Sequence, residues 1–426
     1  QVHVMLWLSL LCSLNHFIAN FCDGFSPGCT SSLDCSLNGD CIHRVCHCTP
    51  PWGGSACEIM RFDPVKNVGG YAAEPNLTTW GGGVLFDGQR YHLFVCVMTK
   101  NCHLSTWRQN SRIDHAVADR VTGPYVFQDV AVNTWSHNPA PVRLADGTYA
   151  IFHIGDGSGA AEGGVSCKSG DLDSSFEESK VFVIDYTENW ADLAFLKFME
   201  FIDANGIAAT DWDMKPLDKD GRAVEGPESI GREQFPLRIF ITRKVQAGST
   251  IHVARFLDGP WEPVLPNTLG HCNNPAPWVH TNGTIFLVCG SSMQLKRAEH
   301  ISGPWLTVAS FNHTGGPAGH YEDPFLYIDK RGFHIVYHVY KTTDREQCAT
   351  ATVSAHAFSK DGFSWHVSKV QPFTSQVEME GLGTVTVSTR ERPYLIFNAV
   401  GQMTHLITAV CSTSQCPKEA SCVNCK

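Results

Sequence analysis

The sequence has little charge and lacks a dense cluster of Lys or Arg. Charged residues make up 17% of the 426 residues, and 32 basic against 42 acidic side chains give a formal net charge of −10. A nucleic-acid surface requires a basic patch or stripe. The composition therefore argues against a nucleic-acid partner and favours a neutral or small one.

Long hydrophobic runs are also absent after the first residues of the chain. The short apolar run MLWLSLLCSL begins at Met5 and is followed by polar sequence, which is typical of an export signal and too short to span a bilayer comfortably. We expect residues 1–21 to be a signal peptide. The mature protein is then expected to be secreted, with no membrane insertion.

Cysteine, in contrast, is abundant, and six of the 18 cysteines follow one another closely near the start of the chain. They are Cys29, Cys35, Cys41, Cys46, Cys48 and Cys57, with Pro-Trp-Gly-Gly shortly before the last of them. Spacing alone leaves fifteen possible pairings. A zinc knuckle is the alternative, but an oxidising compartment favours disulfides. So small a module needs crosslinks for stability.

This spacing resembles an EGF-like module covering residues 22–60. The resemblance implies the disulfides Cys29–Cys41, Cys35–Cys46 and Cys48–Cys57. The acidic run that precedes the first cysteine in calcium-binding modules of this kind is missing here. No metal is therefore expected in the module.

Further cysteines and three glycosylation sequons agree with export. Cys96 and Cys102 lie near one expected hairpin, and residues 412–426, together with Cys411, form a cysteine-rich tail. The Asn-X-Thr sequons lie at Asn76, Asn282 and Asn312. Asn282 is expected in a hairpin turn at the rim of the fold.

A long internal repeat predicts the main fold. The stretches from Ser136, Cys272 and His320 each begin with an Asn-Pro or Asp-Pro step and continue as strand, turn and strand. A Gly-Pro-aromatic or Gly-Phe-Ser-Trp corner follows later in the units, and further units begin near Trp80 and Gly381. We expect an all-β protein with a five-bladed β-propeller over residues 62–411.

The second repeat unit is much longer than the others. The excess, about residues 156–250 in the second blade, shows helical periodicity from Tyr186. We interpret it as an insertion, which is either a surface decoration or a lid over the mouth of the channel.

The first strand of each propeller blade lines the central channel, so the openings of the repeats should converge at one mouth. Asn, His, Glu and Asp predominate there, and such side chains suit a polyhydroxylated ligand. The openings are Gly81-Gly82-Gly83, His137-Asn138-Pro139, Asn273-Asn274-Pro275, Tyr321-Glu322-Asp323-Pro324 and Glu380-Gly381-Leu382.

At these residues the chain resembles the five-bladed β-propeller glycoside hydrolases, above all family 43. The resemblance covers about residues 62–411 and implies three acidic residues on the inner strands of consecutive blades. The glycines from Gly81, with Asn138 and Asn274, stand where the family would place carboxylates, and only Asp323 matches the family's step. The ancestral activity is therefore either lost or relocated.

A relocated carboxylate pair is expected from the last two blades. Glycoside cleavage needs one carboxylic acid and one carboxylate, and crowding raises the pKa of one member so that it stays protonated. We expect Glu322 or Asp323 to work with Glu380, close to Glu378. The expected substrate-binding residues are Asn138, Asn274, His137, His271 and His320.

Structural roles are the alternative for several of these residues. An Asn or Asp before Pro commonly satisfies backbone donors at the start of a strand, which applies to Asn138, Asn274 and Asp323. The run from Arg390 to Pro393 is a secondary candidate for the site, and the alternative that we favour is a network of salt bridges at the rim. No cofactor is expected, although the His-rich openings could bind a channel cation.

These residues and their spacing support two functions. The first is a secreted glycoside hydrolase that acts through a carboxylate pair. The second is a glycan-binding or adhesive propeller without catalysis, which is favoured by the EGF-like module and the missing acids of the first three blades.

Overall fold

The computed structural model describes residues 28–412, except for 66–69, 72–76, 100–103, 105–106, 108–110, 160–179, 206–211, 220–223, 225–230, 244–247, 265–268, 271, 291, 312–315, 317–318 and 341–352. The expected signal peptide, Asn76, Cys102, His271, Asn312 and the tail beyond residue 412 lie outside these residues. Within them, no helix has both the length and the hydropathy needed to cross a membrane.

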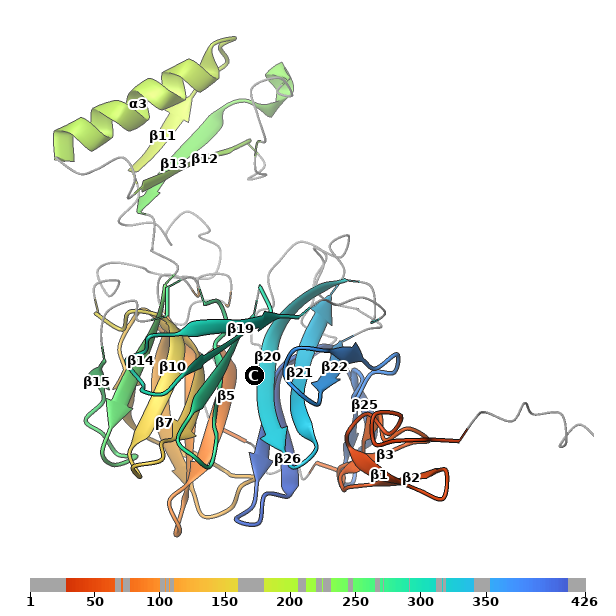
Figure 1. Cartoon of the computed structure of the whole chain (residues 1–426). Helices are drawn as coiled ribbons and strands as arrows, with labels where there is room; N and C mark the ends of the chain where they lie inside the picture. Colours follow the sequence, from red (N-terminus) through yellow and green to blue (C-terminus); the bar gives the residue numbers. More distant parts are fainter. Residues whose placement is uncertain are drawn as a thin grey trace, which may run out of the picture.

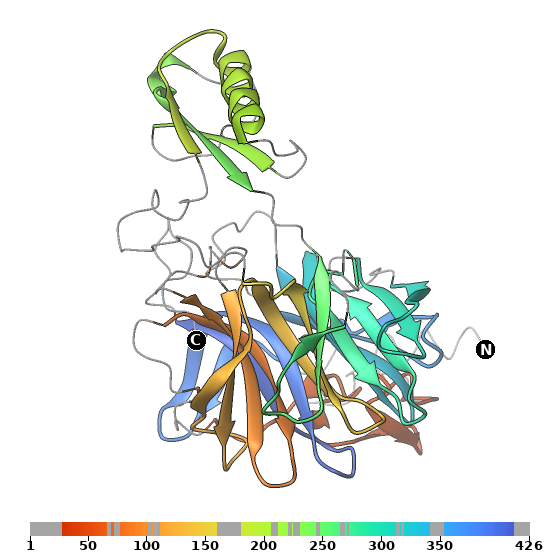
Figure 2. The same ribbon diagram turned by 90° about the vertical axis from the view of Figure 1, so that its left-hand side faces the viewer.

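The main body is built from antiparallel sheets in a propeller-like arrangement (Figures 1 and 2). The first sheet contains β5 (Thr79–Phe86), β6 (Tyr91–Met98), β7 (Ser111–Ala118) and β8 (Val126–Val132). The second contains β9 (Ser136–Arg143), β10 (Tyr149–Gly155), β14 (Ser249–Ala254) and β15 (Glu262–Pro263). The third contains β16 (Ala276–Val279), β17 (Ile285–Cys289), β18 (Gln294–Ala298) and β19 (Leu306–Ser310). The fourth contains β20 (His320–Asp329), β21 (Gly332–Tyr340), β22 (Ser354–Ser359) and β23 (His366–Val367).

The last sheet differs from these four. It has three strands in the described residues, β24 (Gln376–Met379), β25 (Gly383–Phe397) and β26 (Met403–Ser412). The described part of the chain therefore contains four complete four-stranded blades and one three-stranded sheet. Strand β25 contacts both β20 and β5, while β9 contacts β5 and β16, and β16 contacts β20. These contacts join the inner strands of all five sheets into a closed ring.

The inner strands share a local irregularity near their beginnings. The pairing register shifts between Trp80 and Gly82 in β5, and it shifts again around residues 323–324 of β20 and 392–393 of β25. Such β-bulges redirect side chains and are frequent beside functional sites. Each inner strand carries a residue with positive φ near the point where it enters the ring: Gly81 (56°), Asn138 (56°), Asn274 (46°), Asp323 (53°) and Arg392 (56°).

The long second unit contains a small α/β unit between β10 and β14. Its elements are β11 (Lys180–Ile184), α3 (Trp190–Asn205), β12 (Trp212–Leu217), the 3-10 helix η6 (Arg232–Gln234) and β13 (Leu237–Arg243). The three strands form a separate sheet in the order β11-β13-β12. Trp190 and Ala194 of α3 pack against Ile184, Leu237 and Ile239 of this sheet. Both views show the unit standing apart from the ring (Figures 1 and 2).

The N-terminal module, residues 28–60, has little regular structure. It contains β1 (Gly39–Ile42), β2 (Val45–Cys48), β3 (Trp52–Gly53) and β4 (Ile59–Met60). Its disulfides are Cys29–Cys41, Cys35–Cys46 and Cys48–Cys57, the same pairs that the resemblance implies. A fourth disulfide, Cys272–Cys289, lies in the third unit, and Cys96 is a buried thiol.

Buried histidine pairs recur between the middle strands of three sheets. His92 Nδ1 lies 2.8 Å from His115 Nε2 in the first sheet, His153 Nε2 lies 2.8 Å from His252 Nδ1 in the second, and His334 Nδ1 lies 3.1 Å from His356 Nε2 in the fourth. Burial lowers the pKa of His153 to about 3 and that of His252 to about 4. It also lowers the pKa of His115, His334 and His356.

These pairs predict that the fold loses stability in mild acid. An unfolded histidine has a pKa near 6.5 and takes up a proton that the folded side chain refuses. Their stabilising contribution is therefore complete above about pH 6.5 and declines below it, by about 1.4 kcal/mol per pH unit for each such histidine. Urea unfolding between pH 7 and 5 should show a falling free energy of unfolding. An unchanged value would contradict the prediction.

Candidate functional site

A chain of hydrogen bonds connects the positive-φ residues across the centre of the ring. The Nδ2 group of Asn138 donates to Oδ1 of Asn274 at 2.7 Å, and Nδ2 of Asn274 donates to Oδ1 of Asp323 at 2.6 Å. From the opposite side, Nη1 of Arg392 donates to the same Asp323 oxygen at 2.9 Å. All four residues are buried. The chain, centred on one carboxylate, therefore joins the inner strands of four sheets.

The fifth positive-φ residue, Gly81, leaves space for this chain. A Cβ atom at Gly81 would lie 3.1 Å from the side chain of Arg392. The left-handed conformation and this close approach both favour glycine at this position. The first sheet therefore accommodates the guanidinium instead of contributing a carboxylate.

An acidic cluster with one histidine lies just before these residues along the strands. Nδ1 of His338 on β21 lies 3.4 Å from Glu322 on β20, and its Nε2 lies 3.8 Å from Glu391 on β25. One side-chain donor atom from each of Glu322, Asp323, His338 and Glu391 lies within 4.8 Å of those of the other three. The side chain of Glu322 is 28% exposed and that of Glu391 only 10%. Adjacent sheets thus present two carboxyl groups of unequal burial.

Burial and mutual charge set the proton affinities of this cluster. Burial raises the pKa of Glu391 to about 7, although the charge of His338 lowers it. Burial by itself would lower the pKa of His338. The neighbouring carboxylates of Glu391 and Glu322 have the larger combined effect and raise this pKa to about 9. Below about pH 7 the cluster can therefore hold a protonated Glu391 beside a charged His338.

This arrangement suits proton transfer better than metal binding. The cluster has oxygen and nitrogen donors that could hold a cation, but a metal-bound imidazole must first lose its proton. The raised pKa of His338 opposes that loss. A buried carboxyl group with a raised pKa, such as Glu391, beside a second carboxyl group is the arrangement used for general acid catalysis.

The structure brings together only part of the site expected from sequence. Glu322 and Asp323 belong to it, whereas Glu378 is exposed within β24 and Glu380 is exposed in the turn that follows. Glu380 is therefore not brought into this cluster, because the last sheet contributes Glu391 from β25 instead. The run from Arg390 to Pro393 is likewise not a rim salt-bridge network, since Arg392 is buried against Asp323.

The expected hydroxyl-binding residues are also placed differently. The side chains of Asn138 and Asn274 bind to each other, and the amide nitrogen of Asn274 binds Asp323. His137 is buried, with Nδ1 2.9 Å from Cys96 Sγ and its ring stacked on Trp107. His320 is exposed at the start of β20, and Asn282 is exposed in its hairpin turn.

Sequence reasoning does not find His338, and it treats Glu391 and Arg392 only as secondary candidates. Their signal is the step Glu391-Arg392-Pro393, which matches Glu322-Asp323-Pro324 in position before an aromatic strand. Arginine seldom adopts positive φ, in contrast to Asn and Asp, so the step did not resemble the others. His338 lies on a second strand, which the repeat openings do not include.

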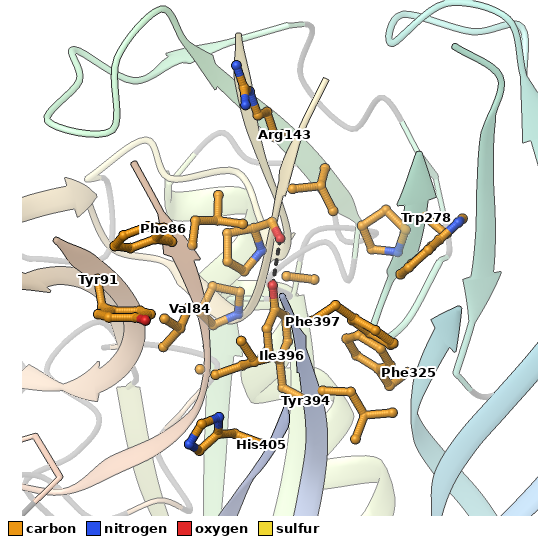
Figure 3. Close-up of a pocket in the computed structure, with 18 of the residues that line it drawn as sticks. Val84, Phe86, Tyr91, Arg143, Trp278, Phe325, Tyr394, Ile396, Phe397 and His405 are labelled. Carbon is orange, nitrogen blue, oxygen red and sulfur yellow. Dashed lines mark hydrogen bonds between the residues drawn. The ribbon is translucent and has the colours of Figure 1, made fainter. Parts of the chain in front are cut away.

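A cavity of about 860 Å³ lies on the other side of the hydrogen-bonded chain. Its walls contain the prolines that follow the positive-φ residues, namely Pro139, Pro275, Pro324 and Pro393. Aromatic and aliphatic side chains dominate the lining, and the hydroxyl of Tyr394 donates to the carbonyl of Pro141 at 2.9 Å (Figure 3). Glu322, Asp323, His338 and Glu391 are not among the residues that line this cavity, whereas Arg392 is.

No family model matches the chain, and no curated protein matches its sequence. Solved structures with a similar fold include a thermostable family-43 glycoside hydrolase, with 8% identity over 82% of this chain and 88% of that chain and a TM-score of 0.46. A family 117 glycoside hydrolase of the marine bacterium Zobellia galactanivorans shows 12% identity over 80% and 85% of the two chains, with a TM-score of 0.42.

The GH43 protein BlXynB from Bacillus licheniformis is also similar, with 12% identity and a TM-score of 0.42. The match covers 82% of this chain and 52% of BlXynB, so this chain spans about half the length of that protein. At such low identities and TM-scores, function has to be inferred from the residues of this chain.

The central ion pair predicts a large stability effect. Replacing Asp323 with Ala leaves the charge of Arg392 buried without its partner, which should reduce the free energy of unfolding by about 3–5 kcal/mol. The exposed control Glu380→Gln should change it by no more than about 0.5 kcal/mol. Chemical denaturation at pH 7 measures both. Equal stability of the two variants would show that the pair does not support the ring.

Proposed function

We propose that this chain is a secreted carbohydrate-active protein, a glycoside hydrolase in which Glu391 and Glu322 form the working carboxyl pair. In this proposal the three-stranded sheet β24–β26 counts as the fifth propeller blade, and the N-terminal module is EGF-like. One observation supports the activity above all: a buried carboxyl group with a raised pKa lies beside a more exposed one at the shared opening of the inner strands.

Glu391 is the proposed general acid. Its pKa of about 7 keeps a large part of it protonated near neutral pH, which is the state needed to donate to a leaving oxygen. Glu322, being more exposed, is the proposed carboxylate that faces the sugar. The two lie within the 4.8 Å cluster, nearer to the separation of about 5 Å in retaining enzymes than to the roughly 6.5–9.5 Å of inverting ones.

The proposed reaction has two steps. A carboxylate oxygen of Glu322 attacks the anomeric carbon, the bond from that carbon to the glycosidic oxygen breaks, and Glu391 gives its proton to the departing oxygen. Water then attacks the same carbon, Glu391 takes a proton from this water, and Glu322 is released. His338, whose pKa is raised to about 9, remains charged beside Glu322.

Asp323 has a positioning role in this proposal rather than a catalytic one. Its Oδ1 atom already accepts hydrogen bonds from Asn274 and Arg392. Each partner belongs to a different sheet, and Asp323 and Arg392 directly follow the two working glutamates in the chain. The ion pair therefore fixes the distance between Glu322 and Glu391.

A glycan-binding protein without catalysis is the second candidate. It is favoured by Gly81, Asn138 and Asn274, which place no carboxylate at the openings of the first three sheets. Binding without cleavage would require only the polar surroundings of the mouth. A panel of furanosides and pyranosides separates the two candidates, because only the hydrolase releases reducing sugar.

Substitution of the carboxyl pair should abolish hydrolysis without unfolding the protein. Glu391→Gln and Glu322→Gln are each expected to lower kcat by at least about 100-fold, within the usual range for loss of an acid–base group, while glycan binding persists. Glu380→Gln is the matched control and should retain full activity. If Glu380→Gln were inactive and Glu391→Gln active, the assignment of Glu391 would be wrong.

The pH profile should report the proton on Glu391. Because the acid must be protonated, kcat/KM is expected to fall as the pH rises through about 7. The charge of His338 lowers the pKa of Glu391, so His338→Gln should move this alkaline limb to higher pH. A limb that stays in place in that variant would exclude Glu391 as its origin.

A further inference from the structure

The three histidine pairs differ in what their outer ring nitrogens contact. In the fourth sheet, His334 Nε2 faces the Asp329 carboxylate at 3.3 Å, while His356 Nδ1 faces the Asn38 amide nitrogen at 3.5 Å. A proton on the Nε2 atom of each ring satisfies these contacts, because His334 then donates to Asp329 and His356 donates to His334. The Asn38 amide can donate to the remaining nitrogen, so two neutral rings suffice.

The pair in the second sheet is satisfied in the same way. His153 Nδ1 lies 3.0 Å from the carbonyl oxygen of Ile154 and can donate to it. His153 Nε2 is then an acceptor for a proton on His252 Nδ1. Again each ring is neutral and each contact has one donor.

The pair in the first sheet has an acceptor at both ends. His92 Nε2 lies 3.0 Å from Asp87 Oδ2, and His115 Nδ1 lies 3.4 Å from Asp129 Oδ2. If both outer nitrogens carry protons for these carboxylates, the inner nitrogens, 2.8 Å apart, face each other with two lone pairs. Neutral rings cannot satisfy all three contacts. One extra proton on either ring would satisfy all three contacts, and so would a metal cation held between the two inner nitrogens.

A third donor reaches this point from the neighbouring sheet. Asp258 lies in the turn between β14 and β15, its Oδ1 is 3.9 Å from His92 Nδ1, and its side chain is 67% exposed. His92, His115 and Asp258 each place one donor atom within 4.8 Å of the other two. The corresponding residues before the Gly-Pro steps of the first and third units are Thr122 and Ser302. The acidic turn residue thus occurs beside the pair that has a carboxylate at both ends.

We propose that His92 Nδ1, His115 Nε2 and the Asp258 carboxylate bind a divalent transition metal ion of the Zn²⁺ class, with water as the fourth ligand. Two histidines and one carboxylate are a common donor set for such an ion. Metal–nitrogen bonds of about 2.0–2.1 Å place two tetrahedral ligands about 3.3 Å apart. The histidine nitrogens therefore need to separate by only about 0.5 Å from their present spacing.

The surroundings favour a cation for two further reasons. Asp87 and Asp129 accept from the nitrogens that do not bind metal, and such carboxylate–histidine contacts orient metal ligands and raise their basicity. Three aspartates also surround the two imidazoles, and a divalent ion would compensate their negative charge. The ion would connect the middle strands of the first sheet to the outer hairpin of the second.

The test uses the full chain after treatment with a chelator. Calorimetric titration with Zn²⁺ should show one more bound ion per chain in the wild type than in Asp258→Asn, and Co²⁺ should give the visible spectrum of a four-coordinate site that the variant lacks. Asp129→Asn, which removes a contact outside the ligand shell, should weaken binding by about 10–100-fold. Asp119→Asn, in the corresponding turn of the first unit, is the matched control and should bind as the wild type does.

Two results would overturn the proposal. In the first, the wild type and Asp258→Asn bind the same number of ions with the same affinity. In the second, the bound ion is lost in Glu391→Gln and kept in Asp258→Asn, which would place it in the central acidic cluster. Circular dichroism shows whether each variant is folded. If Asp258→Asn is unfolded, Asp258→Ser is measured in its place, because the third unit has Ser302 at the corresponding position.

Discussion

The shared carboxylate of Asp323 is the interaction on which the central arrangement depends. It lies in the interior and accepts from an amide of the third sheet and from the guanidinium of the last sheet. A buried carboxylate is tolerated only with such partners. Because these partners come from separate sheets, satisfying one charge also fixes how the sheets meet.

This charge also determines what the neighbouring side chains can do. Successive residues of a strand point in different directions, so Asp323 and Arg392 bind each other while the preceding Glu322 and Glu391 lie beside His338. The prolines that follow line the apolar cavity on the other side. The residues on the two sides of each positive-φ position thus contribute to different surroundings, the acidic cluster and the cavity.

Much of the fold could be predicted from the sequence, because the repeat signals depend on local chemistry. Asn-Pro and Asp-Pro steps, hairpin turns and Gly-Pro corners each specify a backbone conformation over a few residues. The cysteine pairs of the N-terminal module coincide with those that its resemblance implies. The periodicity from Tyr186 corresponds to helix α3.

The site was less predictable because its contacts join distant segments. Nothing local indicates that Arg392 fills the place of a missing side chain at Gly81, or that the amides of Asn138 and Asn274 bind each other. Glu380 was favoured because a glycine-rich opening at Gly381 was assigned to the inner strand. In fact β25 is long enough to pair first with β24 and then, beyond Glu391, to enter the ring.

The attachment of the N-terminal module has a consequence for any partner that binds to it. Arg331 of the fourth sheet contacts both carboxylate oxygens of Asp40, at 2.9 and 3.1 Å, and Trp52 packs against His356. A two-point contact of this kind fixes direction as well as distance. The module is therefore held in one orientation on the fourth sheet. A partner that binds the module would also orient the ring.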